Sequence, residues 1–234
     1  MKIYATIILT LILISCKTDP VEKFDKANEQ LPVLTRAGID SILSQFDLID
    51  FDDLDEDYKE YTQSNGKFKN SLRTEQFYEL HGDDVLKYIV GEYRIRNFLS
   101  TDAYFSKNEE DYSKDQKQYW LVDKKMLYMM LDLILRLDEE GYNKYGFHVR
   151  ESHRHPKYNS TKGGASKSQH IWGKAVDIVI KDINNDGKQT QADKTIVLDI
   201  MEEIVGNKGG LGRYPGSMTV HFDCRGHRAR WDKQ

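Results

Sequence analysis

Apolar residues recur every three or four positions in the middle of the chain. Between residues 123 and 139 they are Met126, Leu127, Met130, Leu131, Leu133, Ile134 and Leu137. This spacing gathers them on one face of a helix, so it predicts an amphipathic helix over Asp123–Glu139, with Gly141 positioned to end it. A shorter stripe of isoleucines predicts a second helix over Thr195–Val205.

Short apolar or alternating segments lie between and beyond these helices. They predict strands at Phe147–Val149, Ala175–Ile180 and Thr219–Asp223, and Val85–Phe98 is also rich in strand-forming residues. The strands are few and short, and they alternate with helices. This pattern favours an α+β domain over residues 85–234, with a small antiparallel sheet flanked by helices.

The segment before this domain has weaker patterns. Helical spacing around Ala37–Phe46 and Glu75–His81 predicts a helical extension over residues 36–84. The dense run of acidic residues from Asp50 to Glu60 lacks the spacing of a metal loop, so we interpret it as a solvated face. Residues 17–35 are mostly polar and predict a tether. The alternative is that the fold already begins at Leu31.

The first sixteen residues have the pattern of an export signal. A basic start precedes an apolar run of about a dozen residues, which is too short to span a bilayer as a helix. The run ends in Leu13-Ile14-Ser15-Cys16, which is similar to a bacterial lipobox. We therefore expect Cys16 to be lipidated, and the protein to be anchored to a membrane of the bacterial cell envelope on its extracytoplasmic side.

Composition narrows the possible classes of partner. The 234 residues carry a formal net charge of −4, which gives no support to nucleic-acid binding. Once Cys16 carries lipid, Cys224 has no partner for a disulfide, and we interpret it as a small structural residue. We expect a monomer.

Two histidines and an aspartate are the candidate metal ligands. His170 precedes Asp177 by seven residues, and His221 lies in the last predicted strand. Asp177 alternates with apolar neighbours, so it faces away from the apolar layer. Two histidines and one aspartate leave the fourth tetrahedral position of a catalytic zinc site open. A histidine in a strand is, however, more often an ordinary core or surface group, so these residues alone leave both interpretations open.

The order of short motifs around these residues resembles a known family. The motifs are Ser168-x-His170-x-x-Gly173-x-Ala175-x-Asp177, then Gly209-Gly210-x-Gly212-x-Tyr214, then Val220-His221-x-Asp223. Together they resemble the zinc D-Ala-D-Ala carboxypeptidase and murein endopeptidase family, whose fold is shared with hedgehog signalling domains. The resemblance covers roughly residues 85–232 and includes the segment that ends in Arg154.

The resemblance implies roles for individual residues. His170, Asp177 and His221 would bind zinc, which lowers the pKa of bound water toward ~7 and polarises a carbonyl. Arg154 would hold a substrate carboxylate, and further substrate contacts would come from two residues within the motifs, Ser168 and Tyr214.

The general base departs from the family pattern. Many members carry an acid three residues before the last zinc histidine, and here that residue is Met218. We expect Asp223 to serve instead, with two alternatives: it supports a ligand, or it is itself the third ligand and His221 is catalytic. Glu151-Ser152-His153 also replaces the residues that usually precede Arg154.

A second metal site is predicted between the Asp177 strand and the next helix. Residues 182–193 fit a twelve-residue calcium loop with a glycine at the sixth position. The predicted ligands are Asp182, Asn184, Asp186, the backbone carbonyl of Lys188, and Asp193. The alternative is an ordinary turn rich in Asn, Asp and Gly.

Together these features predict a zinc-dependent peptidase with zinc and calcium as cofactors. It would hydrolyse peptide bonds in peptidoglycan stem peptides or cross-links, as a carboxypeptidase or an endopeptidase. The alternative is a non-catalytic metal-containing lipoprotein of the same fold that binds the cell wall or a protein. The absence of an acid at position 218, which is Met218, keeps this alternative open.

Overall fold

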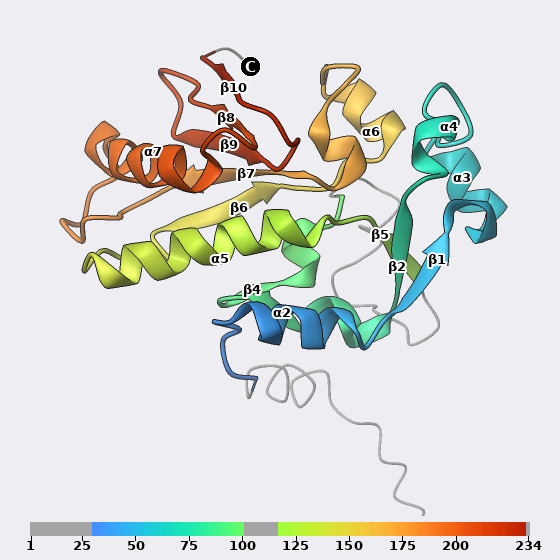
Figure 1. Cartoon of the computed structure of the whole chain (residues 1–234), viewed down its shortest axis with the longest axis horizontal. Coiled ribbons are helices and arrows are strands. Elements are labelled where there is room, and N and C mark those ends of the chain that lie inside the picture. Colours follow the sequence, from blue (N-terminus) through green and yellow to red (C-terminus); the bar gives the residue numbers. More distant parts are fainter. Residues whose placement is uncertain (1–29, 101–116, 233–234) are drawn as a thin grey trace, which may run out of the picture. The chain divides into compact units, whose positions relative to one another are not determined.

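The computed structural model describes residues 30–100 and 117–232 and places the C-terminal half around a five-stranded sheet (Figure 1). Its strands, in spatial order, are β10 (Ala229–Trp231), β8 (Gly210–Gly212), β9 (Thr219–Asp223), β7 (Ala175–Ile180) and β6 (Phe147–Glu151). β10 and β8 are parallel, and all other neighbours are antiparallel. The predicted α+β class with an antiparallel sheet is confirmed.

Two helices pack against this sheet and against each other. They are α5 (Lys124–Glu139) and α7 (Gln191–Val205). The side chain of Asp123 caps α5, all seven apolar residues of the predicted stripe are buried, and Gly141 follows with a left-handed backbone (φ +77). The prediction of α5 is therefore confirmed, and α7 begins four residues earlier than predicted.

The N-terminal segment contains helices and a second sheet. Its helices are α2 (Arg36–Leu43), α3 (Glu56–Tyr61) and α4 (Lys69–Leu72), with 3₁₀ turns η1 (Phe51–Asp53), η2 (Gly82–Leu86) and η3 (Ile95–Phe98). Its antiparallel sheet has the order β1 (Asp47–Asp50), β2 (Gln76–His81) and β5 (Lys117–Trp120), and β3 (Tyr88–Val90) pairs with β4 (Tyr93–Arg94).

The helix predicted at Glu75–His81 is wrong, because this segment is the central strand β2. Its partner β5 begins about forty residues further along the chain, so the pairing depends on contacts that no local window contains. The sheet also crosses the predicted boundary between residues 84 and 85, and residues 31–234 group into one compact unit. That domain boundary therefore stays a prediction.

The fold begins inside the predicted tether. The backbone of Val33 exchanges hydrogen bonds with that of Gly91, at 2.9 Å and 2.7 Å. The predicted signal, Cys16 and most of the tether lie outside the described residues. Among the residues that are described, no helix combines the length and apolar character needed to cross a membrane.

The N-terminal segment also packs against the turn that carries His170. A cluster of buried side chains joins its helices and strands to the 3₁₀ turn η4 (Gln169–Trp172) through Ile171, and Trp172 packs against the same cluster. His170 lies in this turn. Gly173 ends the turn with φ +62 and packs so closely on Leu121 that a Cβ atom would lie 2.2 Å from its carbonyl oxygen. The position of η4 is thus fixed by packing from both sides.

Candidate metal centre

Three side chains from three elements meet over two neighbouring interior strands of the five-stranded sheet. His170 comes from η4, Asp177 from β7 and His221 from β9. The antiparallel register pairs Asp177 directly with His221. Their facing atoms are close: His221 Nδ1 lies 2.8 Å from Asp177 Oδ1 and 3.2 Å from His170 Nε2, and His170 Nε2 lies 3.4 Å from Asp177 Oδ1. All three side chains are buried.

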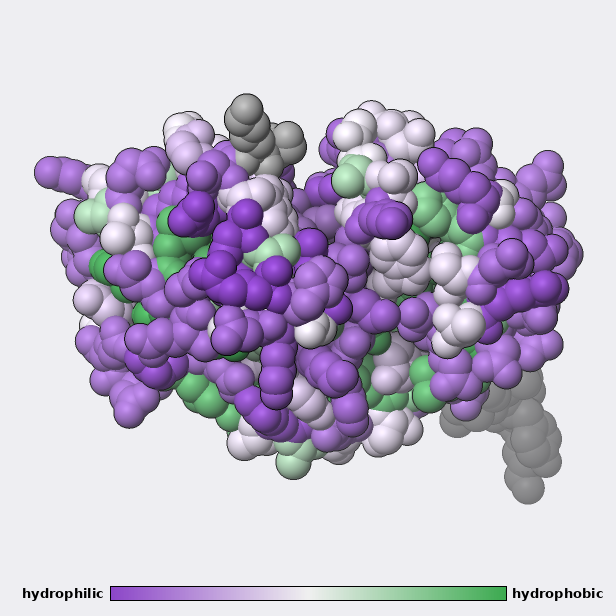
Figure 2. Space-filling model, turned by 45° about the horizontal axis from the view of Figure 1, so that its top comes forward, coloured by the Kyte–Doolittle hydropathy of each residue, from purple (hydrophilic) through white to green (hydrophobic). Residues whose placement is uncertain are grey.

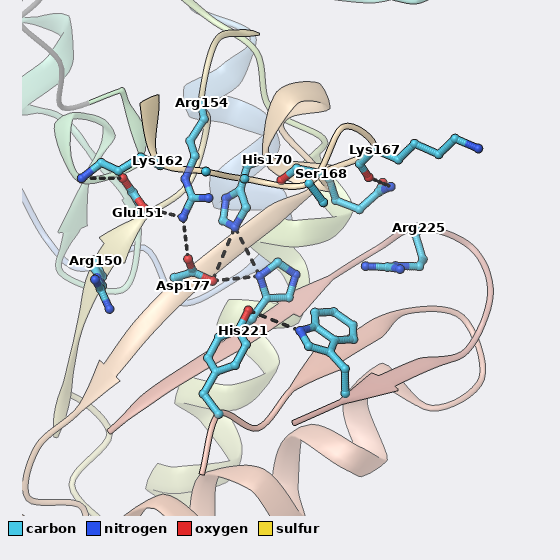
Figure 3. Close-up of a pocket in the computed structure, with 16 residues that line it drawn as sticks. Arg150, Glu151, Arg154, Lys162, Lys167, Ser168, His170, Asp177, His221 and Arg225 are labelled. Carbon is cyan, nitrogen blue, oxygen red and sulfur yellow. Dashed lines mark hydrogen bonds and ion pairs between the residues drawn. The ribbon is translucent and has the colours of Figure 1, made fainter. Parts of the chain in front are cut away.

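The opposite end of each side chain is held by a separate partner, and Figure 3 shows the contact of Arg154 with Asp177. His170 Nδ1 donates to the carbonyl of Ser152 at 2.6 Å, and Arg154 Nη2 donates to Asp177 Oδ2 at 2.8 Å. His221 Nε2 lies 3.0 Å from Asp223 Oδ2. Partners of this kind orient metal ligands and fix the histidine tautomers. The donor set and its surroundings therefore fit a metal ion held by His170 Nε2, Asp177 Oδ1 and His221 Nδ1.

Burial and mutual contact shift the pKa values of this group. Burial lowers the pKa of His170, which keeps its imidazole neutral, as a metal ligand must be. Burial also acts to lower the pKa of His221, but hydrogen bonds to Asp177 and Asp223 outweigh it and raise that pKa. Burial by itself would raise the pKa of Asp177, yet the two histidines together hold it well below its ordinary value.

Asp223 does not have the position of a general base. It is fully buried, and its carboxylate accepts hydrogen bonds from His221, from Gly210 N (3.0 Å) and from Arg225 Nε (2.8 Å). It lies at Nε2 of His221, whereas the other candidate ligands lie at Nδ1. A group on the far nitrogen of a ligand cannot also reach a water on the metal side. This position favours the alternative in which Asp223 supports a ligand over the expected role as general base.

A cavity of about 560 Å³ opens above these ligands. All three residues predicted to contact substrate line it, namely Arg154, Ser168 and Tyr214. Figure 2 shows mainly hydrophilic residues at the rim of the hollow near the top of that view. The three candidate ligands and the three predicted substrate contacts therefore line one cavity, whereas Asp223 does not line it.

Tyr214 has an unusual backbone at this cavity. Its φ is +37, in the left-handed region that a bulky side chain rarely adopts. Such conformations persist where the surroundings enforce them, and they concentrate at functional sites. Burial raises the pKa of Tyr214, so the phenol is neutral and able to donate, and its oxygen accepts from Trp231 Nε1 at 3.4 Å.

Glu151 is a site residue that the motifs did not reveal. It is buried, lines the cavity and forms an ion pair with Arg154, whose Nη2 also binds Asp177. In the part of the chain that the structure describes, Glu151 and Asp177 are the carboxylates that line the cavity. The sequence feature that could have revealed Glu151 is the replacement, by Glu151-Ser152-His153, of the residues that usually precede Arg154 in the family.

The predicted calcium loop closes through hydrogen bonds within the protein. Asp182 accepts from the backbone of Asp186 (3.1 Å) and Gly187 (3.0 Å), and Lys188 N donates to Asp186 Oδ1 at 2.9 Å. Asn184 Oδ1 also accepts from Asp186 N, at 3.1 Å. These are the contacts of an ordinary turn rich in Asx residues.

Asp193 has a structural role at the end of this loop. It is fully buried and accepts from the backbone of Ile183 (2.8 Å), Asn184 (3.2 Å) and Thr190 (2.8 Å), which completes a capping box for α7. Among the described residues, His170, Asp177 and His221 form the group found close enough to hold a metal. Calcium at residues 182–193 thus gains no support from the structure and stays a prediction.

Comparison with known families agrees with this geometry. Residues 73–231 match the model of a peptidase family described as peptidoglycan L,D-endopeptidase MepK. The chain belongs to this family. The match runs from just before β2 to β10 and includes all three candidate ligands. Membership confirms the resemblance noted in the motifs and supports a role as a peptidoglycan endopeptidase. No curated protein and no solved structure matches the chain.

Proposed function

We propose that this protein is a zinc-dependent endopeptidase that hydrolyses a peptide bond in peptidoglycan cross-links. The observation that carries the proposal is the convergence of three donor atoms on one point at the cavity, each on a side chain whose other end is already held. Family membership supports the substrate, and a buried pair of imidazoles with one carboxylate is a donor set typical of zinc.

Zinc bound at these atoms would polarise the scissile carbonyl and lower the pKa of a bound water. The protein's own groups would orient the peptide. Arg154 Nη2 is occupied by Glu151 and Asp177, whereas its Nε is buried with no partner among the described groups. An unpaired buried donor is costly unless a ligand satisfies it, so we assign this edge of the guanidinium to a substrate oxygen.

We place the proton acceptor at Glu151. A general base needs a carboxylate or imidazole at the cavity, and Asp177, His170 and His221 are already assigned as ligands. Glu151 is the remaining cavity-lining carboxylate in the described part of the chain, and its ion pair with Arg154 keeps it oriented. The neutral phenol of Tyr214 supplies a hydrogen-bond donor at the same cavity.

We also propose an extracytoplasmic location with a lipid anchor at Cys16, because its substrate lies outside the cytoplasm and the first sixteen residues have the pattern of a lipoprotein signal. Cys16→Ser should move the protein from the detergent phase to the aqueous phase in a detergent partition assay. Recovery of both forms in the aqueous phase contradicts the anchor.

The function is tested with purified cross-linked muropeptide dimers and, separately, monomers with an intact C-terminus. We expect the zinc-loaded protein to convert dimers into monomers and to leave the monomer's C-terminal residue in place, with no product after chelation or in His221→Ala. Asp232→Asn, an exposed carboxylate outside the cavity, serves as the matched control and retains activity. Trimmed monomers indicate a carboxypeptidase. Dimer binding without product indicates the non-catalytic alternative.

A further inference from the structure

Arg150 faces the cavity because of a local irregularity in β6. Arg150 and Glu151 are neighbours in sequence, yet both line the cavity. Successive residues of a regular strand point to opposite faces, so a regular β6 would turn one of them away. The pairing of β6 with β7 shifts register between Val149 and Glu151, and such a bulge re-aims a side chain.

Arg150 has no carboxylate partner in the described part of the chain. Its Nη1 donates to the hydroxyl of Thr219 at 3.1 Å, and no ion pair to a described acidic residue is present. Thr219 lies two residues before His221 on β9. The guanidinium of Arg150 is therefore held next to β9, the strand that carries His221, and no described carboxylate neutralises its charge.

Positive charge is concentrated in this cavity although the whole chain has a net charge of −4. The cationic lining residues are Arg150, Arg154, Lys162, Lys167 and Arg225. Arg154 is paired with Glu151 and Asp177, and Arg225 is paired with the buried Asp223. The charge that remains uncompensated favours an anionic ligand, and a concave wall focuses its field.

The two least committed cations lie on opposite sides of the candidate ligands. Figure 3 shows Arg150 on the β6 side of the cluster, and Lys167 on the far side, on the segment that leads into η4. Lys167 is exposed, and no ion pair joins it to a residue within the described ranges. A peptide lying across the ligands would thus meet one free cation on each side of its scissile bond.

We propose that the cavity selects a peptide whose scissile amide carries a free carboxylate on each side, one bound by Arg150 and the other by Lys167. The inference rests on the proposed function, which supplies the cross-linked peptide as substrate. A guanidinium binds a carboxylate through two parallel hydrogen bonds, and an ammonium binds it as a point charge. The Arg150 contact is therefore the more selective of the two.

The test uses four synthetic peptide dimers joined by one amide, with the carboxylates next to that amide free or amidated on the donor half, the acceptor half, both or neither. Affinity is measured by calorimetry on the full chain after chelation, so that no dimer is cleaved, and cleavage is measured after zinc is restored. We expect each amidation to weaken binding by about tenfold, the order of one charge-assisted hydrogen bond.

The variants assign each charge to one half. Arg150→Gln should bind the dimer with both carboxylates free about tenfold more weakly than wild type does. The affinity of this variant should also no longer change when the carboxylate of one half is amidated. Lys167→Gln should show a smaller loss and insensitivity to the other half. Arg213→Gln removes an exposed cation outside the cavity lining and should behave as wild type. The variants' melting temperatures verify that they are folded.

Equal binding of all four dimers, or insensitivity of both variants to the same half, overturns the inference. Equal cleavage of all four dimers overturns it too, while leaving the proposed function intact. Selective binding with no cleavage by the zinc-loaded chain has the opposite meaning, since the charge selection then stands and the peptidase function fails.

Discussion

The role of Asp223 is best tested by Asp223→Asn, which keeps the shape of the side chain and removes its charge. The carboxylate accepts hydrogen bonds from His221 Nε2 (3.0 Å), Gly210 N (3.0 Å) and the guanidinium of Arg225, and it is fully buried. An amide retains one acceptor oxygen and turns an NH₂ group toward a donor. Charge-assisted hydrogen bonds contribute about 1.5–3 kcal/mol each.

Because Arg225 is partly exposed and water can compensate part of its loss, we expect the free energy of unfolding to fall by about 2–4 kcal/mol. We also expect zinc affinity to fall by about ten- to a hundredfold, the usual effect of removing a partner that orients a ligand. Urea unfolding of the metal-free chain measures the first quantity, and competition with a chelating indicator measures the second.

The decisive readout is kcat at saturating zinc. If Asp223 only orients His221, excess zinc restores most of the activity of Asp223→Asn. Unchanged zinc affinity together with a large loss of kcat at saturating zinc would show that Asp223 transfers a proton and would refute our reasoning. Asp232→Asn is the control, and its stability should change by less than about 0.5 kcal/mol because that carboxylate is exposed.

Three further predictions concern the protonation or removal of buried carboxylates. Glu151→Gln should lower kcat by about 10²–10⁴ while zinc content stays at the wild-type level, and full activity of this variant would exclude Glu151 as the proton acceptor. Asp177 and Asp223 have pKa values held below the ordinary 3.8 in the folded, metal-free chain, so their stabilisation is present above about pH 4 and is lost as the pH falls. Urea unfolding between pH 7 and pH 3 should show this loss, and a flat profile contradicts it. Asp193→Ala should lower the free energy of unfolding by about 2 kcal/mol or more because it removes a helix cap and leaves buried backbone donors unpaired, and an unchanged melting temperature would refute that role.

The sequence was informative where the determining contacts are local. The stripe of apolar residues in α5 specifies its own buried face, so the helix could be predicted within one residue at each end. β2 could not be predicted, because its pairing with β5 joins segments about forty residues apart. The candidate ligands were proposed because the motifs keep their order along the chain. The family match confirms the resemblance that these motifs indicated, and the ligand roles stay a prediction.

The features of the site that the sequence did not reveal depend on the register between paired strands. The sequence places His221 and Asp223 on one strand face, but only the pairing of β9 with β7 and β8 decides that Asp177 meets one ring nitrogen and Asp223 the other. Glu151 was missed for a similar reason. The bulge that brings it and Arg150 to one cavity leaves no mark in the alternation of apolar and polar residues.

The central claim is that His170, Asp177 and His221 form one zinc site that performs peptide hydrolysis. The most direct measurement is a titration of zinc into the chelator-treated chain while the rate of cleavage of a cross-linked muropeptide dimer is recorded. We predict that the rate rises in proportion to added zinc and stops rising at one zinc ion per chain. A rate that does not depend on zinc, or a zinc-saturated chain that yields no monomers, would contradict the account.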